Sequence, residues 1–281
     1  MTTHPLKIHH HPADSPNDRP PLLFVHGGYT HAGSWQQNFI PYFNARGYDC
    51  HAIDLAGHGQ SGGQDQLDNF GLADYTEDLA RAIESLADTP VLIGHSMGTL
   101  VIDRYLSSAH ARAVAVALLA PVPPTGTGGS ATRLALQVPG FFEELPNAVG
   151  GTPTADTLRV MAQVYFSPDL SPEDIERFMP LIGNESEHAV AEMVTLPFRP
   201  AGRRPKLPAL VMSGSCDAVF PASMLHFTAA IWNARSVIVE GAGHMLILDP
   251  QWPVAAEKLL EWVDNLPVTH PPESLVGCTG S

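Results

Sequence analysis

Strand-like and helix-like segments alternate along most of the chain, and this alternation limits the possible folds more than any other feature of the sequence. Short apolar runs bounded by Gly, Pro or Asp are typical of buried strands, and segments with the apolar period of an amphipathic helix separate them. The predicted strands are residues 21–25, 48–54, 91–94, 113–121, 209–214 and 236–241, and the predicted helices between and after them are residues 34–46, 72–86, 99–108, 222–232 and 250–265.

Strands that are joined through helices usually run parallel, so the sequence predicts an α/β fold. Its centre is expected to be a mostly parallel sheet with helices on both faces. Ligands of such sheets bind at the carboxyl ends of the strands. The chemistry of the chain is therefore expected in the loops that follow the predicted strands.

The alternation is interrupted once, between residues 122 and 207, where no strand is predicted. Four helix-like segments separated by Pro and Gly lie there, at residues 131–136, 155–166, 172–182 and 185–195. An insertion of this length between two core strands favours a helical cap over the site, and a separate binding domain is the alternative. The predicted organisation is a core domain of residues 1–121 and 208–267, a helical cap of residues 122–207, and a disordered tail of residues 268–281.

The composition is that of an acidic globular chain. Of its 281 residues 44% are hydrophobic and 16% charged, and the formal net charge is −14. Such a surface repels phosphate backbones and anionic lipids, so neither nucleic acid nor a membrane is expected as a partner. The N-terminal stretch lacks the apolar region of a signal peptide, and no apolar run reaches the roughly 20 residues that span a bilayer. We therefore expect a cytoplasmic protein, and the sequence leaves its oligomeric state open.

The metal-binding side chains of the sequence form no ligand pattern. The three cysteines, Cys50, Cys216 and Cys278, are few and far apart. The run from His9 to His11 is expected to be a polar stretch beside the N-terminal strand, because a native metal site needs ligands that the structure fixes. We expect no metal site.

The segment LIGHSMGTL, residues 92–100, places a serine between a predicted strand and a predicted helix. Gly94 and Gly98 flank Ser96 in a GxSxG pattern, and a sharp turn of this kind leaves no room for a side chain at either glycine. The turn would lift Ser96 clear of the sheet, near the positive end of the helix dipole. Ser96 is therefore the predicted nucleophile, whereas an ordinary turn that carries a serine is the alternative.

A serine hydroxyl needs a base beside it at neutral pH, and the base needs a carboxylate to fix its tautomer. The predicted base is His244, since Gly241 and Gly243 form a loop able to return its imidazole over the sheet. The predicted acid is Asp217, in the loop SGSCDAVFP after the preceding strand. The N–H of Met97, directly after the serine, would stabilise a developing oxyanion.

Taken together, these segments resemble the α/β-hydrolase superfamily over about residues 20–265. Five motifs occur in the family's order, namely FVHGG, DLAGHGQSG, GHSMG, GSCDAVFP and GAGHMLILDP. The resemblance implies a member similar to serine carboxylesterases and lipases, with the chain order Ser96, Asp217 and His244 for nucleophile, acid and base.

The resemblance also implies an oxyanion hole formed by the N–H groups of Gly28 and Met97. The motif HGGY departs from the common pattern, because glycine occupies a position often taken by a larger residue. Tyr29 is therefore a further candidate contributor. His95 and His26 are expected to shape their loops rather than to act in catalysis.

An apolar pocket is expected above the serine, since ligand pockets are mostly apolar. Its predicted substrate-binding residues are Tyr29, Phe141, Phe142, Val219 and Met245. The predicted reaction is hydrolysis of a small to medium hydrophobic carboxylic ester through an acyl-enzyme, without a cofactor.

Other activities share the fold and stay open at this point. A lactonase, a thioesterase, a C–C bond hydrolase or a perhydrolase would use the same three residues, and a cofactor-free dioxygenase would use His244 and Asp217. A receptor that binds a small hydrophobic molecule without turnover is the rival from another class. Ser96 argues against haloalkane dehalogenases and epoxide hydrolases of the superfamily, which use an aspartate nucleophile.

Overall fold

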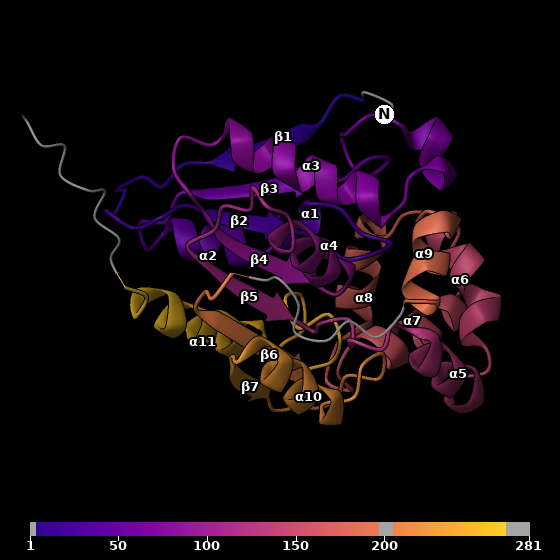
Figure 1. Ribbon diagram of the computed structural model, residues 1–281. Helices are drawn as coiled ribbons and strands as arrows, with labels where there is room; N and C mark the ends of the chain where they lie inside the picture. The colour runs from indigo at the N-terminus through magenta and orange to yellow at the C-terminus, as the bar shows by residue number, and fades with distance from the viewer. Residues whose placement is uncertain (1–3, 197–204, 268–281) are drawn as a thin grey trace, which may run out of the picture.

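A seven-stranded sheet forms the centre of the computed structural model, which describes residues 4–196 and 205–267 (Figure 1). Its strands are β1 (Lys7–His11), β2 (Leu22–Val25), β3 (Cys50–Asp54), β4 (Val91–His95), β5 (Ala115–Leu119), β6 (Ala209–Gly214) and β7 (Arg235–Val239). Their order in the sheet is β1-β3-β2-β4-β5-β6-β7. All neighbours pair in parallel except β1, which runs antiparallel to β3. The predicted α/β class with a mostly parallel sheet is confirmed.

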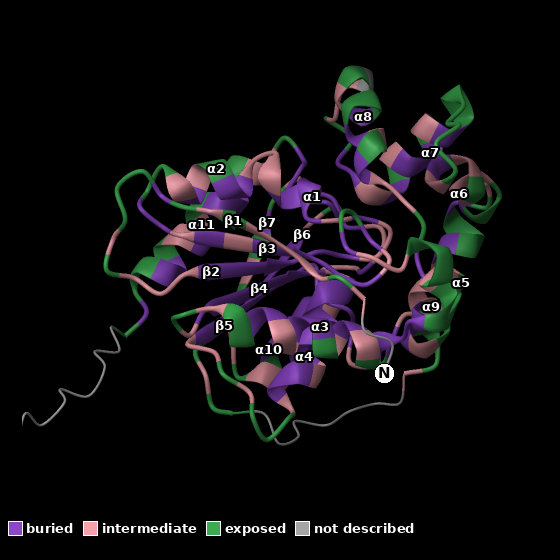
Figure 2. Cartoon of the chain, turned by 90° about the horizontal axis from the view of Figure 1, so that it is seen from above, coloured by how far each residue is buried: buried purple, intermediate pink, exposed green. Residues whose placement is uncertain are grey.

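Helices cover both faces of this sheet, as the view from above shows (Figure 2). One face carries α1 (Gly33–Gln36), α2 (Phe39–Asn44) and α11 (Trp252–Asp264), and the other carries α3 (Leu72–Ser85), α4 (Met97–Leu106) and α10 (Ser223–Trp232). Strand β2 shows why its apolar run is continuous. Leu22 and Phe24 belong to the core on the first face, whereas Leu23 and Val25 belong to the core on the second.

All helices between β5 and β6 lie together at one end of the sheet (Figures 1 and 2). They are α5 (Gly128–Gln137), α6 (Phe141–Val149), α7 (Ala155–Tyr165), α8 (Pro172–Phe178), the 3-10 turn η2 (Met179–Leu181) and α9 (Glu187–Val194). We call residues 122–207 the insertion; its residues 197–204 lie outside the described part of the chain. The insertion has an apolar cluster of its own around Phe141, Val160 and Met161. The predicted disordered tail, residues 268–281, also lies outside the described residues.

The observed helices differ from the predicted ones at two places. The helix expected at residues 34–46 is split into α1 and α2, because Asn38 has a non-helical φ of −133°. Helix α6 was not expected, since Gly140 and Pro146 are typical helix breakers. Pro146 nevertheless lies inside α6. The first strand, β1, was not predicted either. Three of its five residues are histidines, so its sequence lacks the apolar pattern by which a strand is recognised.

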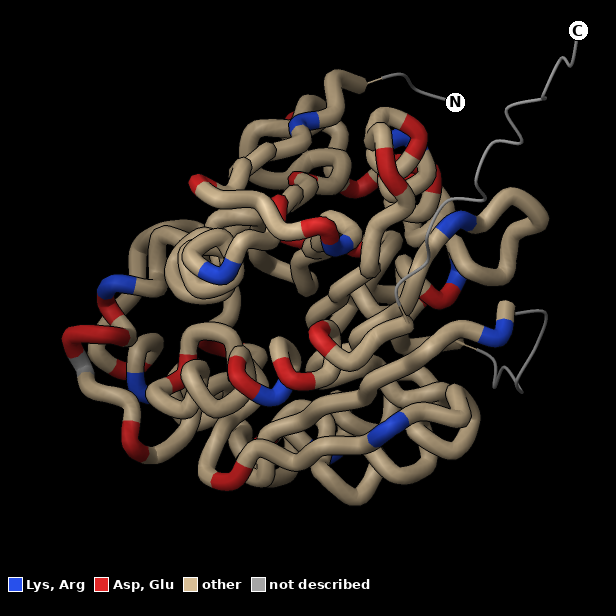
Figure 3. Tube along the Cα trace, turned by 90° about the vertical axis from the view of Figure 1, so that its left-hand side faces the viewer, with Lys and Arg blue, Asp and Glu red and all other residues tan. Residues whose placement is uncertain are grey.

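Charged residues are spread over the molecule, with Asp and Glu more frequent than Lys and Arg (Figure 3). Among the acidic residues, Asp54, Asp78, Asp103, Glu185, Asp217 and Asp249 are buried. Within residues 4–196 and 205–267, no helix combines the length and the apolar character needed to cross a membrane.

Gly214 ends β6 and touches the backbone that precedes His244. A Cβ at this position would collide with the carbonyl oxygens of Ala242 and Gly243. We expect Gly214→Ala to lower the free energy of unfolding by about 2–3 kcal/mol, as measured by urea denaturation, since overpacking of a tight contact forces the backbone apart.

Gly129→Ala is the matched control, because a Cβ there meets no atom within 4 Å. Its unfolding free energy should stay equal to that of the wild type or rise slightly, since alanine favours a helix. Equal stability of the two variants would contradict the close contact at Gly214.

Candidate active site

Ser96 occupies the sharp turn between β4 and α4. Its backbone has φ 49° and ψ −118°, outside the regions that residues with a Cβ normally adopt. The flanking glycines permit this turn. A Cβ at Gly94 would lie 2.9 Å from the Gly98 carbonyl carbon and oxygen, and one at Gly98 would lie 2.5 Å from the Val25 oxygen. The crowding expected from the GxSxG pattern is present at both positions.

The side chains of Ser96, His244 and Asp217 form one hydrogen-bonded series. Nε2 of His244 lies 3.0 Å from Oγ of Ser96, and Nδ1 lies 2.9 Å from Oδ2 of Asp217. Oδ1 of Asp217 accepts the N–H groups of Val219 and Phe220 at 2.8 and 2.7 Å. Because an ionised carboxylate only accepts, Nδ1 carries the proton and Nε2 faces the serine hydroxyl as an acceptor. The arrangement can take a proton from Ser96 as its oxygen attacks.

The loop that carries His244 is fixed from three directions. Nε2–H of His95 donates to the His244 carbonyl at 3.0 Å. The Met245 N–H donates to the carbonyl of Tyr165, at the end of α7, at 2.8 Å. Oδ2 of Asp249 accepts the N–H groups of Gly243 and of Ser167 in the insertion, each at 2.8 Å. The insertion therefore takes part in placing the histidine.

Two histidines beside the series are held neutral by burial. Burial lowers the pKa of His95 to about 3 and that of His26 to about 4, and neighbouring histidines add to both shifts. Nδ1–H of His26 donates to the Gly27 carbonyl at 2.8 Å, and its Nε2 accepts the Leu55 N–H at 3.1 Å. Both rings are thus engaged with loop backbone, in agreement with the expectation that they shape their loops.

The loop after β2 packs directly against the serine turn. A Cβ at Gly27 would lie 2.8 Å from Nδ1 of His95 and 3.1 Å from Cβ of Ser96. Gly28 and Met97 both line the cavity above the serine. Within the described residues, neither of their N–H groups donates a hydrogen bond to another protein group. Both N–H groups therefore stay candidates for the predicted oxyanion hole.

A cavity of about 210 Å³ lies above Ser96 and His244. The five predicted substrate-binding residues Tyr29, Phe141, Phe142, Val219 and Met245 all line it. The insertion adds further apolar side chains, and none of the described lining residues is an Asp, Glu, Lys or Arg. Burial raises the pKa of the Tyr29 phenol to about 12, so that this group is neutral as well. The cavity suits an uncharged, apolar molecule.

The histidines near the N-terminus are engaged in the β1–β3 region. Nε2 of His9 pairs with the buried Asp54 at 2.8 Å, and the ring of His10 stacks on His51 with centroids 4.4 Å apart. In the part of the chain that the structure describes, no group of three or more His, Cys, Asp or Glu side chains is arranged to hold a metal ion.

Two buried carboxylates near the site, Asp249 and Glu185, were not predicted from the sequence. Asp249 lies in the motif GAGHMLILDP. Its hydrogen bond with the Gly243 N–H could have been predicted from this motif, because both residues belong to it. Its hydrogen bond with the Ser167 N–H could not.

The second, Glu185, lies behind the loop of Gly28 and Tyr29 and directly precedes Ser186, the N-cap residue of α9. In the predicted helix of residues 185–195 it would be an ordinary acid of the first turn. Its contacts with Tyr29, His58 and Tyr75 come from residues more than 100 positions away, which no local pattern predicts.

Comparison with known proteins identifies the family. A sequence model of the alpha/beta hydrolase fold matches residues 20–251, and the chain belongs to this family. A non-heme chloroperoxidase of Streptomyces lividans is 34% identical over 111 residues, which cover 39% of this chain and 39% of the relative. The matched parts span between 22% and 39% of the lengths of the curated relatives.

Solved structures agree with this fold along nearly the whole chain. A Mycobacterium tuberculosis protein assigned as a non-heme bromoperoxidase has a TM-score of 0.75 at 20% identity, over 93% of this chain and 96% of that one. An esterase from Thermogutta terrifontis has a TM-score of 0.72 at 19% identity, over 93% of both chains. At these identities the likeness establishes the fold alone.

Asp217→Asn tests the hydrogen bond to Nδ1 of His244. An amide NH₂ facing Nδ1 would favour the tautomer with the proton on Nε2, which cannot accept from the serine. We expect kcat on an ester substrate to fall by roughly 10³–10⁴-fold with an unchanged circular dichroism spectrum, a loss like that seen for the same change in a serine protease.

Asp264→Asn is the control, because that carboxylate binds the Tyr48 hydroxyl and not the site. It should keep the wild-type kcat. Near wild-type turnover in Asp217→Asn would show that another carboxylate orients the histidine.

Proposed function

We propose that the protein is a serine hydrolase of small to medium, uncharged carboxylic esters, and that it works through an acyl-enzyme on Ser96. The observation that carries the proposal is the unbroken hydrogen-bond series from Asp217 through His244 to Ser96 at the floor of an apolar cavity. The membership of the chain in the alpha/beta hydrolase family supports hydrolysis in general. The ester as the scissile group is our inference from the site.

In this mechanism each residue has one task. Ser96 attacks the carbonyl carbon while Nε2 of His244 takes its proton, and the N–H groups of Gly28 and Met97 bind the oxyanion. Protonated His244 then gives the proton to the leaving alkoxide. In the second half, His244 takes a proton from water as the water attacks the acyl carbon. His244 then returns this proton to Oγ of Ser96 as the bond between the acyl carbon and the serine oxygen breaks. Asp217 keeps the imidazole in the required tautomer and stabilises its charged form.

The insertion serves as a cap that selects the acyl group. Five of its helical side chains, Leu134, Phe141, Met161, Phe178 and Met193, face the same cavity as Ser96. Because the cavity volume is limited, short and medium acyl chains or an aromatic acyl group fit better than a long-chain triglyceride.

Hydrogen peroxide could replace water as the acceptor of the acyl group. The Streptomyces relative is named a non-heme chloroperoxidase. On an acyl-enzyme, peroxide in place of water would release a peracid with the same proton transfers. Perhydrolysis would thus be a variant of the same proposal rather than a separate site.

The test is a substrate screen with oxygen measured in parallel. We expect p-nitrophenyl esters from acetate to octanoate to be cleaved faster than dodecanoate or triolein, with a lactone, a thioester and a quinolone as the competing classes. Ser96→Ala and His244→Ala should both lose at least about 10³-fold in kcat, because residues of one catalytic unit fail together.

Oxygen uptake separates the ester mechanism from cofactor-free oxygenation, in which His244 would deprotonate an aromatic substrate. No oxygen should be consumed by the wild type with any substrate of the screen. Uptake that survives in Ser96→Ala and disappears in His244→Ala would overturn the hydrolase proposal.

A further inference from the structure

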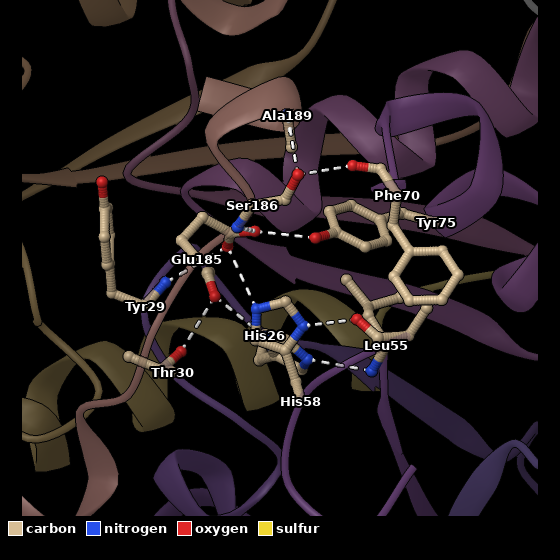
Figure 4. A network of polar contacts seen from close by, with 12 residues as sticks. His26, Tyr29, Thr30, Leu55, His58, Phe70, Tyr75, Glu185, Ser186 and Ala189 are labelled. Atoms are coloured by element: carbon tan, nitrogen blue, oxygen red, sulfur yellow. Dashed lines mark hydrogen bonds and ion pairs between the residues drawn. The ribbon is translucent and has the colours of Figure 1, made fainter. Parts of the chain in front are cut away.

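A second buried polar cluster lies behind the loop of Gly28, and its centre is a residue of the insertion (Figure 4). The carboxylate of Glu185 is fully buried. Its Oε1 accepts the Tyr75 hydroxyl at 2.7 Å and the Ser186 N–H at 2.8 Å. Its Oε2 accepts the Tyr29 N–H at 3.3 Å and Nε2–H of His58 at 3.2 Å. One side chain of the insertion thus binds three separate core segments.

Tyr29 needs such support, because its backbone is strained. Its φ of 60° lies in the left-handed region that residues other than glycine seldom adopt. Its N–H is held by Glu185, and its carbonyl accepts the Gly183 N–H at 2.9 Å. Both polar backbone groups of the residue directly after Gly28 are therefore held from residues 183–185. A Cβ at Gly28 would lie only 3.3 Å from Oε2 of Glu185, so the carboxylate also packs against Gly28 itself.

The charge of this carboxylate is balanced by His58. Nδ1 of His58 faces the Ala56 carbonyl at 2.9 Å and must carry a proton, so a charged ring also donates from Nε2. Burial alone would lower the pKa of His58 and raise that of Glu185. The attraction between the two groups outweighs burial, and the pKa of His58 is raised while that of Glu185 is lowered. As a neutral pair, they do not repel negative charge that develops at the Gly28 N–H.

We propose that Glu185 is a positioning residue for the oxyanion loop, by which we mean residues 26–31. From the insertion, Glu185 holds the strained Tyr29 backbone and thereby fixes the direction of the Gly28 N–H. The inference rests on the ester-hydrolase function proposed above. It makes an oxyanion donor in the core depend on a side chain of the cap. Correct seating of the insertion would then be a condition for catalysis as well as for substrate selection.

Glu185→Gln removes this support with little change of shape. Without the carboxylate charge, the buried His58 becomes neutral, and its Nε2 turns from a donor into an acceptor. The amide NH₂ then faces Nε2, and the Tyr29 N–H meets a donor instead of an oxygen. The strained loop can relax, and the Gly28 N–H loses its direction.

The experiment compares Glu185→Gln with Glu192→Gln, a second insertion carboxylate that binds a core N–H. Glu192 accepts the Leu72 N–H at 2.6 Å and contacts Arg104, and it does not touch the oxyanion loop. We expect kcat on the best p-nitrophenyl ester to fall by about 10- to 100-fold in Glu185→Gln, with KM within twofold of wild type. Glu192→Gln should keep both constants. If Glu185 only stabilised the fold, its variant would contain less folded protein, but kcat per folded molecule would equal that of the wild type.

Hydrogen exchange gives a readout that needs no activity. In Glu185→Gln the amides of residues 26–31 should exchange at least about tenfold faster than in the wild type, and in Glu192→Gln they should not. If the wild type cleaves no ester, the ester proposal fails, while the exchange data still decide whether Glu185 holds the loop. Glu185→Asp, which keeps the charge but withdraws it by one methylene, is measured beside Glu185→Gln in case the amide does not fold. Wild-type kcat and wild-type protection in both Glu185 variants would overturn the inference.

Discussion

Close backbone contact at the carboxyl edge of the parallel sheet is the constraint on which the rest of the site depends. Gly98 packs against the carbonyls at the end of β2, Gly27 against the serine turn, and Gly243 against the backbone of Phe166. A side chain at any of these positions would separate loops that must touch. Since the hydrogen bonds of Ser96 and His244 span about 3 Å, such a separation would break them.

The site is shared between the core and the insertion. The core supplies the three residues of the hydrogen-bond series and both predicted oxyanion donors. The insertion supplies most of the apolar wall, and it also holds the two loops that flank the serine. Ser167 and the Tyr165 carbonyl bind the histidine loop through Asp249 and Met245, and Glu185 binds the loop of Gly28. In the proposed mechanism, substrate enclosure and catalytic geometry therefore depend on the same segment.

Most of the core could be predicted from the sequence because its signals are local. The continuous apolar run of β2 and the helical period of α3 each report burial directly. The positions of Ser96, Asp217 and His244 follow from turns that come after strands. Helix α6 could not be predicted, since the packing of Phe141 and Ala148 outweighs the unfavourable Pro146. The role of Glu185 could not be predicted either, because its partners meet it only after the insertion has folded onto the core.

The most direct test of the account is to trap the covalent intermediate. The protein is mixed with an excess of a p-nitrophenyl ester and quenched in acid within the first turnover. It is then digested, and the masses of its peptides are measured by mass spectrometry. The account predicts the acyl mass on the peptide that contains Ser96, and no adduct in Ser96→Ala. An acyl group on another residue, or wild-type turnover in Ser96→Ala, would contradict it.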